Sequence, residues 1–190
     1  MTETREAILT AARLRAQAHG YTGLNFRDLG QDVGITSATL HYYFPTKADL
    51  GVAVAKRYRE DSATALEAIW SEHRSPATRL KSYPSVFRRA LENGNRMCMC
   101  GQMAAEFDDL PDDVKAEIKG FADDHIGWLV KVLAVAQGGS GQAAIRRRAR
   151  AIYAAVTGAQ LLARSRGDLK TYDDTIESYR ALGLLAVAGE

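Results

Sequence analysis

Apolar residues recur at helical spacing some two dozen residues into the chain, and they predict a short helix there. Phe26, Leu29 and Val33 give this helix one inward face. Asn25 precedes the pattern, and its side-chain oxygen can accept hydrogen bonds from the first amides of a helix. Gly34 follows the pattern and supplies the permissive backbone that ends a helix. We therefore expect a helix between these two residues, followed by a tight turn.

A second short helix is predicted directly after the turn. Leu40 and Phe44, four residues apart, point inward together. Thr36 or Ser37 can cap its start, and Pro45 ends it. The outer face then carries small and polar side chains without an acidic residue, and such a face can approach phosphates and base edges closely. The two helices have the pattern of a helix-turn-helix, although an ordinary helical hairpin shares the same local features.

Helical spacing continues through the rest of the chain, with no strand-like alternation and no internal repeat. Pro, Gly and Asn mark the breaks between segments. The predicted segments are a helix at 47–72, one that starts between Pro76 and Pro84 and ends at Asn93 and Gly94, a short one at 97–107, one at 111–137, a linker from Gly138 to Gln142, and helices at 142–165 and 172–188. The expected fold class is all-α.

The composition is that of an ordinary globular protein, and it limits the number of domains and the location of the chain. The 190 residues are 46% hydrophobic and 25% charged, with a formal net charge of +2. This length suits one domain or a small head fused to a larger body. The sequence contains no apolar run long enough to cross a membrane, and its first residues lack the layout of a secretory signal. We expect a soluble, cytoplasmic protein that does not bind membranes.

Sulfur and imidazole groups do not form the spacing of a metal or catalytic site. Cys98 and Cys100 are separated by one residue, so on a helix they point to nearly opposite sides. The four histidines are scattered without ligand spacing. The sequence contains no nucleophile elbow, phosphate loop or paired-carboxylate motif. We expect no metal, no cofactor and no enzymatic activity, and keep an all-α enzyme using a cysteine and a protein-binding adaptor as alternatives.

Four segments together resemble the amino-terminal domain of the TetR family of transcriptional regulators. They are ILTAA from Ile8, GY from Gly20, FRDLGQDVGI from Phe26 and TLHYYFPTKADL from Thr39. The resemblance implies a three-helix DNA-binding head and a larger helical body that binds a small molecule and dimerises. We accordingly expect a helix-turn-helix DNA-binding domain at 1–46 and a ligand-binding and dimerisation domain at 47–190.

The chain departs from the family pattern at two places in the head. Arg15 and Ala16 stand late in the first helix, where family members usually carry a bulky apolar pair. On the family pattern, a head without this apolar pair is expected to be less stable. His41 replaces a Tyr that is usual in the recognition helix, and imidazole and phenol differ in reach and in donor geometry.

The resemblance also implies which residues meet double-stranded operator DNA. The head carries five basic and five acidic side chains over residues 1–50, so we expect few phosphate contacts and a shallow salt dependence. The recognition helix should enter the major groove, with two side chains, Tyr42 and Lys47, on phosphates. The full expected set is Arg27, Thr36, Ser37, Thr39, His41, Tyr42 and Lys47.

Soft and aromatic side chains of the body suit an adaptable apolar pocket, and they suit a plain core equally well. The family's habit of a ligand cavity favours the pocket. The expected effector-binding residues are Trp70, Phe87, Cys98, Met103, Phe121, His125, Trp128 and Tyr153. An alternative is an electrophile sensor in which Arg96 favours the thiolate of Cys98.

The last two predicted helices are rich in small and apolar residues, which let helices pack closely. In the family this pair forms a four-helix bundle with its two-fold mate, so we expect a homodimer. An intrachain core is the alternative. The run Arg146, Arg147, Arg148 and Arg150 fits a solvated helix face better than a second nucleic-acid patch. The expected function is a repressor that a small-molecule effector releases from a palindromic operator.

Overall fold

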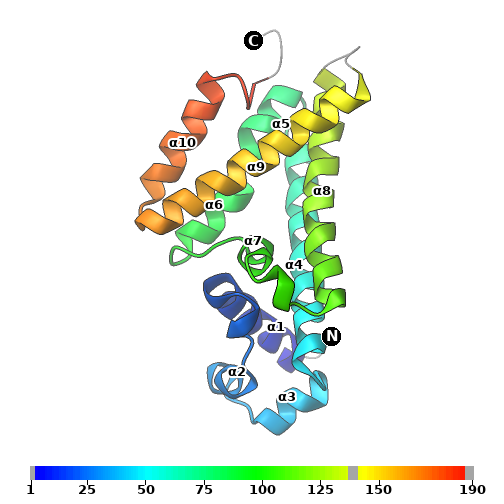
Figure 1. The fold of residues 1–190 in the computed structure, drawn as a ribbon, viewed down its shortest axis with the longest axis vertical. Helices are drawn as coiled ribbons and strands as arrows, with labels where there is room; N and C mark the ends of the chain where they lie inside the picture. Colours follow the sequence, from blue (N-terminus) through cyan, green and yellow to red (C-terminus); the bar gives the residue numbers. More distant parts are fainter. Residues whose placement is uncertain (1–2, 137–140, 187–190) are drawn as a thin grey trace. The chain divides into compact units, whose positions relative to one another are not determined.

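The computed structural model describes residues 3–136 and 141–186, and within these ranges every regular element is helical, which confirms the all-α fold class. Figure 1 shows the helices in chain order. They are α1 (Glu3–His19), the 3-10 turn η1 (Tyr21–Gly23), α2 (Phe26–Val33), α3 (Ser37–Tyr43), α4 (Lys47–Glu72), α5 (Pro76–Ser82), α6 (Ser85–Glu92), α7 (Met99–Ala104), η2 (Phe107–Asp109), α8 (Asp112–Ala136), α9 (Gln142–Arg166) and α10 (Leu169–Ala181).

Local signals position α2 and α3 as the sequence predicts. The Asn25 side chain accepts hydrogen bonds from the amides of Arg27, at 2.9 Å, and Asp28, at 3.3 Å. Gly34 closes α2 at a φ of 74°, in the left-handed region that favours glycine. The Thr36 hydroxyl caps α3 by accepting from the amide three residues later, at 3.1 Å.

The last helix differs from the prediction of 172–188. The α10 helix begins at Leu169 because the Asp168 side chain caps it, and it ends at Ala181 before Gly183, whose φ is 77°. The apolar residues after Gly183 therefore do not continue the helix. Residues 187–190, and residues 138–140 of the predicted linker, lie outside the described ranges.

The chain packs as two compact units. Unit 1 comprises Met1–Asp61 and Cys98–Phe121, and unit 2 comprises Ser62–Met97 and Ala122–Glu190. The helices α4 and α8 each contribute residues to both units. The units reflect packing, so the boundary after residue 46 between a DNA-binding and an effector-binding domain stays a functional prediction.

Unit 1 contains α1, α2 and α3 together with α7. Its core includes Ile8, Leu29 and Leu40, none of which has any exposed surface. The α7 helix packs against α1, and the Glu106 carboxylate that follows it accepts a hydrogen bond from the Thr22 amide at 3.1 Å. The segment around α7 is therefore part of the same packing unit as the predicted head.

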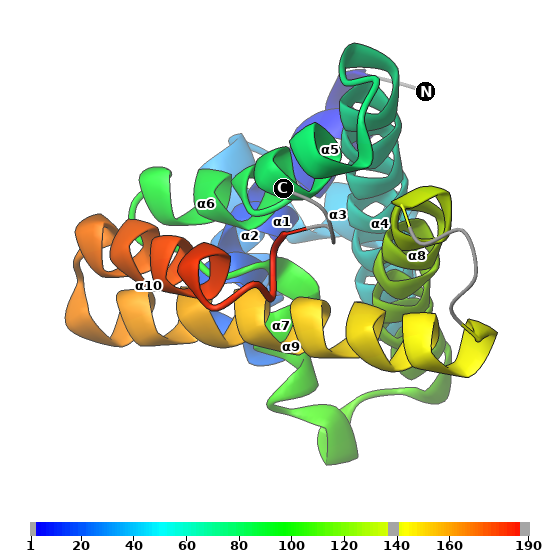
Figure 2. The ribbon, with the colours of Figure 1, turned by 90° about the horizontal axis from the view of Figure 1, so that it is seen from above.

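Unit 2 is built on the pair of helices α9 and α10, which lie side by side in Figures 1 and 2. Two buried hydrogen bonds fix α6 against this pair. The Gln160 amide donates to the carbonyl of Phe87 at 2.7 Å, and the Tyr172 hydroxyl donates to the carbonyl of Pro84 at 2.7 Å. Among the described residues, no helix combines the length and the apolar character that a membrane span needs.

Candidate functional site

The outer face of α3 is the clearest candidate binding surface in unit 1. Leu40 and Phe44 are buried against the core, which turns Ser37, His41 and Tyr42 outward. The Tyr42 side chain is 82% exposed, unusually so for a large aromatic residue, and its ring lies edge-on to a neighbouring tyrosine at 5.2 Å. An exposed phenol on a short helix without acidic side chains suits contact with a phosphate backbone.

His41 is oriented by its neighbours on α2 and at the end of α3. Its Nδ1 lies 3.1 Å from the Pro45 carbonyl oxygen, and its ring lies 4.6 Å from the ring of Phe26. Because a carbonyl oxygen only accepts, Nδ1 carries the proton and Nε2 of the neutral ring is an acceptor. Such an acceptor suits an exocyclic amine of cytosine or adenine in a major groove, rather than a phosphate oxygen.

Thr36 and Thr39 combine structural and potential contact roles. Their hydroxyl oxygens lie 3.0 Å apart, and the Thr36 oxygen also accepts from the Thr39 amide. The Thr36 side chain is exposed and the Thr39 side chain is half-buried. The two hydroxyls therefore fix the conformation of the first turn of α3.

Two basic residues predicted at the interface differ in their surroundings. Arg27 is exposed and forms none of the ion pairs found in the described ranges. The Lys47 ammonium lies 4.5 Å from the centre of the Tyr21 ring, a cation–π arrangement that orients it. A neighbouring cap was not predicted from the sequence: the Thr46 amide donates to the Asp49 carboxylate at 2.9 Å, and the Asp49 amide donates to the Thr46 hydroxyl oxygen at 3.1 Å. The three-residue spacing of these polar residues was the available signal.

The interior of unit 2 contains a buried chain of three polar side chains. His125 Nε2 lies 2.8 Å from the Ser62 hydroxyl oxygen, and its Nδ1 lies 3.0 Å from the Tyr83 hydroxyl oxygen. Burial lowers the pKa of His125 to about 3, so the ring is neutral near pH 7. Ser62 was not predicted from the sequence, where its one signal is a polar residue within the apolar stripe of a long helix.

The structure brings together four of the eight predicted effector-binding residues. The ring of Phe87 lies 5.2 Å from that of His125 and 6.2 Å from that of Tyr153. Trp128 stacks on Tyr83 at 5.6 Å, and its indole nitrogen is buried without a hydrogen-bond partner among the described residues. The cluster thus combines aromatic surface with one unsatisfied donor.

Of the other four predicted residues, one belongs to unit 2 and three belong to unit 1. Trp70 is half-buried and lies between two cations, with the Arg79 guanidinium 3.5 Å and the Lys131 ammonium 3.8 Å from its ring centre. The remaining three belong to unit 1 and are buried there. They are Cys98, Met103 and Phe121.

The two thiols are buried, and burial raises the pKa of both Cys98 and Cys100. The Arg96 side chain belongs to unit 2 and contacts Asn93 there. Its guanidinium donates to the carbonyl of Asn93 at 2.5 Å and to the amide oxygen of the same side chain at 3.1 Å. Within the described ranges, no three His, Cys, Asp or Glu side chains gather as metal ligands would.

Comparison with known proteins finds matches in sequence and in fold. Residues 8–54 match the family described as bacterial regulatory proteins, tetR family. Transcriptional regulator AcuR of Cereibacter sphaeroides is 25% identical over 60% of this chain, and HTH-type transcriptional regulator RutR of Escherichia coli strain K12 is 26% identical over 66% of it. These matches span 54% and 61% of the two relatives. A TetR transcriptional regulator from Legionella pneumophila is 29% identical with a TM-score of 0.88, covering 96% of this chain and 98% of that one.

Proposed function

Because the chain belongs to the TetR family of transcriptional regulators, we propose that it is a cytoplasmic homodimeric repressor that a small-molecule effector releases from a palindromic operator. The family consists of regulators rather than enzymes, which sets aside the all-α enzyme. The proposal adds to the family assignment the contact residues, the assembly and the chemistry of the effector.

The outer face of α3 carries the DNA-binding part of the proposal. Tyr42, 82% exposed, and the oriented His41 lie on a surface that no acidic side chain of α3 interrupts. We expect Arg27, Tyr42 and Lys47 to position the head on phosphates. Base edges would be read by Ser37, Thr39 and His41, with Thr36 holding the helix start.

The decisive experiment is footprinting of the purified chain on the DNA upstream of its own gene. Lys47→Ala should weaken binding, whereas Lys56→Ala, a matched removal of an exposed lysine on the same helix, should not. A protected palindrome that Lys47→Ala weakens supports the proposal. Equal binding by both variants would show that the assigned face is wrong.

The homodimer is supported by apolar side chains left exposed on α9 and after α10. Leu161 is 59% exposed, Leu162 is 41% exposed and Leu182 is 80% exposed in the single chain. Gly158 on the same face of α9 is also exposed and would let a second helix approach closely. A two-fold interface buries such a patch on both subunits at once.

The interior of unit 2 supports a proposal for the class of effector. His125 is neutral near pH 7, its two nitrogens have polar partners, and the surrounding residues are aromatic. A charged ligand would lose its hydration there without a counter-ion. We propose an uncharged aromatic effector with an oxygen that accepts a hydrogen bond from the Trp128 indole.

The thiol-sensing alternative is disfavoured by the burial of Cys98, since a raised pKa lowers the fraction of reactive thiolate. A mild alkylating electrophile distinguishes the two mechanisms. Reversible effector binding predicts that wild type and Cys98→Ser keep the same DNA affinity after treatment. Release of the wild type alone would establish Cys98 as the sensor.

A further inference from the structure

A cavity beside α10 is not used by the proposed function. It has a volume of about 450 Å³ and lies within unit 2, between α10 and the two helices α5 and α6 that meet at Pro84. A second cavity of about 410 Å³ shares Lys81, Glu177 and Arg180 with the first. Volumes of this size are typical of small-molecule sites.

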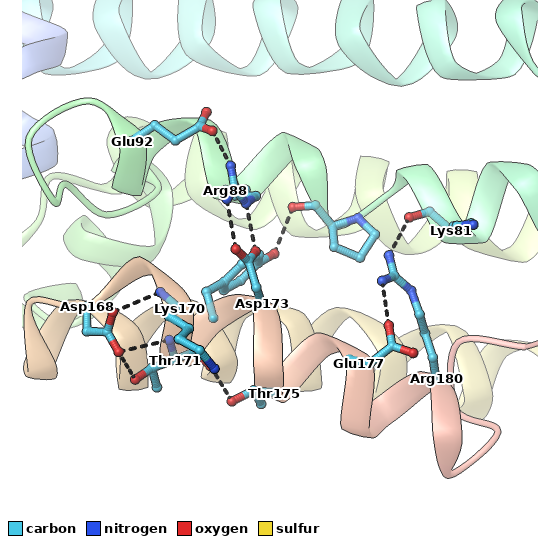
Figure 3. A network of polar contacts seen from close by, with 12 residues as sticks. Lys81, Arg88, Glu92, Asp168, Lys170, Thr171, Asp173, Thr175, Glu177 and Arg180 are labelled. Atoms are coloured by element: carbon cyan, nitrogen blue, oxygen red, sulfur yellow. Dashed lines mark hydrogen bonds and ion pairs between the residues drawn. The ribbon is translucent and has the colours of Figure 1, made fainter.

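Arg180 stands in the wall that the two cavities share, and its guanidinium is held from two sides (Figure 3). Nη2 donates to the carbonyl of Lys81 at 2.9 Å, and Nη1 donates to the Glu177 carboxylate at 3.1 Å. Nε is buried and has no acceptor among the described residues. A buried donor on a cation is costly to leave without an acceptor, and Nε would gain one if the Arg180 side chain turned it toward a ligand in the cavity.

Positive charge is available at this end of the cavity only. The exposed Lys81 side chain lines both cavities and forms no ion pair within residues 3–136 and 141–186. At the other end, Arg88 donates to both carboxylate oxygens of Asp173, at 2.7 and 2.8 Å, and also to Glu92. Figure 3 shows these two ends, with Arg88 enclosed by carboxylates and Arg180 held by one.

Apolar surface lies beside the cations. Pro84 and Ile176 line the larger cavity and are buried, and the Tyr172 ring lines it with its hydroxyl turned to the Pro84 carbonyl. The competing Glu177 carboxylate is 71% exposed, and an exposed ion pair of this kind is weak. The site therefore combines two cationic donors with an apolar floor.

We propose that this groove binds a small organic carboxylate. One carboxylate oxygen would accept from Arg180 Nε and the other from Lys81 Nζ, while the apolar part of the ligand covers Pro84 and Ile176. An inorganic anion could satisfy the donors but would make no apolar contact with Pro84 and Ile176.

Titration of the full chain with hexanoate, followed by NMR, tests the charge and the apolar floor separately. Hexanamide has nearly the same shape without the charge, and inorganic phosphate has the charge without the apolar part. We expect saturable binding of hexanoate, and binding of the other two at least about tenfold weaker. Hexanamide binding as tightly as hexanoate would overturn the role of the cations, and phosphate binding as tightly would overturn the role of the floor.

Variants locate the site. Lys81→Met should weaken hexanoate binding about tenfold, and its folding is secure because the side chain makes no ion pair in the described structure. Arg180→Lys keeps the charge but removes Nε and should weaken it likewise. Arg89→Met, which removes an exposed cation from α6 outside the cavity, is the control. Unchanged affinity in Lys81→Met would refute the site, whatever the outcome of the DNA-binding experiments.

Discussion

The Arg15 guanidinium on α1 grips the Asp32 carboxylate on α2, with Nη2 donating to Oδ1 at 3.0 Å and Nε donating to Oδ2. The same guanidinium donates to the Asp28 carboxylate at 3.3 Å. The pKa of Asp32 is lowered by its hydrogen bond to Arg15. A cation that bridges two helices thus occupies the position at which the family usually has an apolar side chain. Ala16 beside it is fully buried, so the departure from the pattern is accommodated.

Replacing Arg15 by Met should reduce the free energy of unfolding by about 1 kcal/mol, because both partners are partly exposed and solvent screens the pair. Part of that loss should disappear in 1 M salt. Urea unfolding of wild type, Arg15→Met, Asp32→Asn and the double variant measures the coupling between the two residues. Additive losses in the double variant would show that the contact contributes nothing.

Replacing His41 by Ala should change sequence preference more than overall affinity. Loss of the Nε2 acceptor should cost roughly 1–3 kcal/mol of discrimination at one base pair of the operator. Binding to a set of operators with single base changes measures this. His19→Ala, at an exposed histidine on α1, is the control. A uniform loss over all operators would assign His41 to the phosphate backbone instead.

Replacing Tyr42 by Ala should instead weaken binding to all operator sequences alike, because a phosphate contact carries no base information. Lys47→Ala should in addition lower the slope of log affinity against log salt by about 1. Fluorescence anisotropy at several salt concentrations measures both effects. If neither variant changes affinity, the duplex does not meet this face.

Acid should weaken unit 2 through His125. The unfolded chain binds a proton near pH 6.5, whereas the folded chain binds it only near pH 3, so stability falls as pH decreases between these values. The slope should reach at most about 1.4 kcal/mol per pH unit. His125→Gln should reduce this slope, while His19→Gln should not. Chemical denaturation at a series of pH values provides the comparison, and parallel curves for His125→Gln and wild type would contradict the assignment.

Replacing Leu161 by Glu should dissociate the proposed dimer and weaken operator binding, because a charge would be buried in the seam. Two recognition helices can meet successive major grooves only when the dimer holds them about 34 Å apart. Val135→Glu introduces the same charge at a similarly exposed apolar residue of α8 and should leave the dimer intact. Sedimentation at low micromolar concentration measures the oligomeric state of both variants. If Leu161→Glu is still a dimer, the interface between the subunits does not include Leu161.

Replacing Trp128 by Phe should weaken effector binding about tenfold, because the indole donor is lost while the ring remains. A thermal-shift screen of uncharged aromatic carbonyl compounds would identify the ligand, with Trp70→Phe as the matched control. The ligand that releases operator must also bind more weakly when operator is present. Equal affinity of a ligand for Trp128→Phe and for wild type would show that the indole does not contact the effector.

The parts of the fold that could be predicted are those whose signals are local. Asn25 and Thr36 accept hydrogen bonds from amides within a few residues of themselves, and Gly34 ends α2 through its own backbone conformation, so α2 and α3 follow from the sequence. The end of α10 did not follow. Apolar spacing continues past Gly183, and only the observed φ of 77° shows that the backbone turns there.

The candidate site shows the same limit. The outer face of α3 could be predicted because residues four positions apart, Leu40 and Phe44, lie on the same inward face of one short helix. The Ser62, Tyr83 and His125 network could not, since its members are separated by 21 to 63 positions and meet only through packing. Conversely, Arg96 and Cys98 are neighbours in sequence but belong to different compact units.

The hydrogen bonds that fix α6 against α9 and α10 use main-chain acceptors, the carbonyls of Pro84 and Phe87. A carbonyl survives almost any exchange of the side chain that it accompanies, so the donors Gln160 and Tyr172 keep their partners when residues of α6 change. Side chains that face the aromatic interior can then diversify during evolution without loosening the helices that are proposed to hold two subunits together. A regulator built in this way can acquire a new effector by point mutation while its assembly, and with it the spacing of its operator, is inherited unchanged.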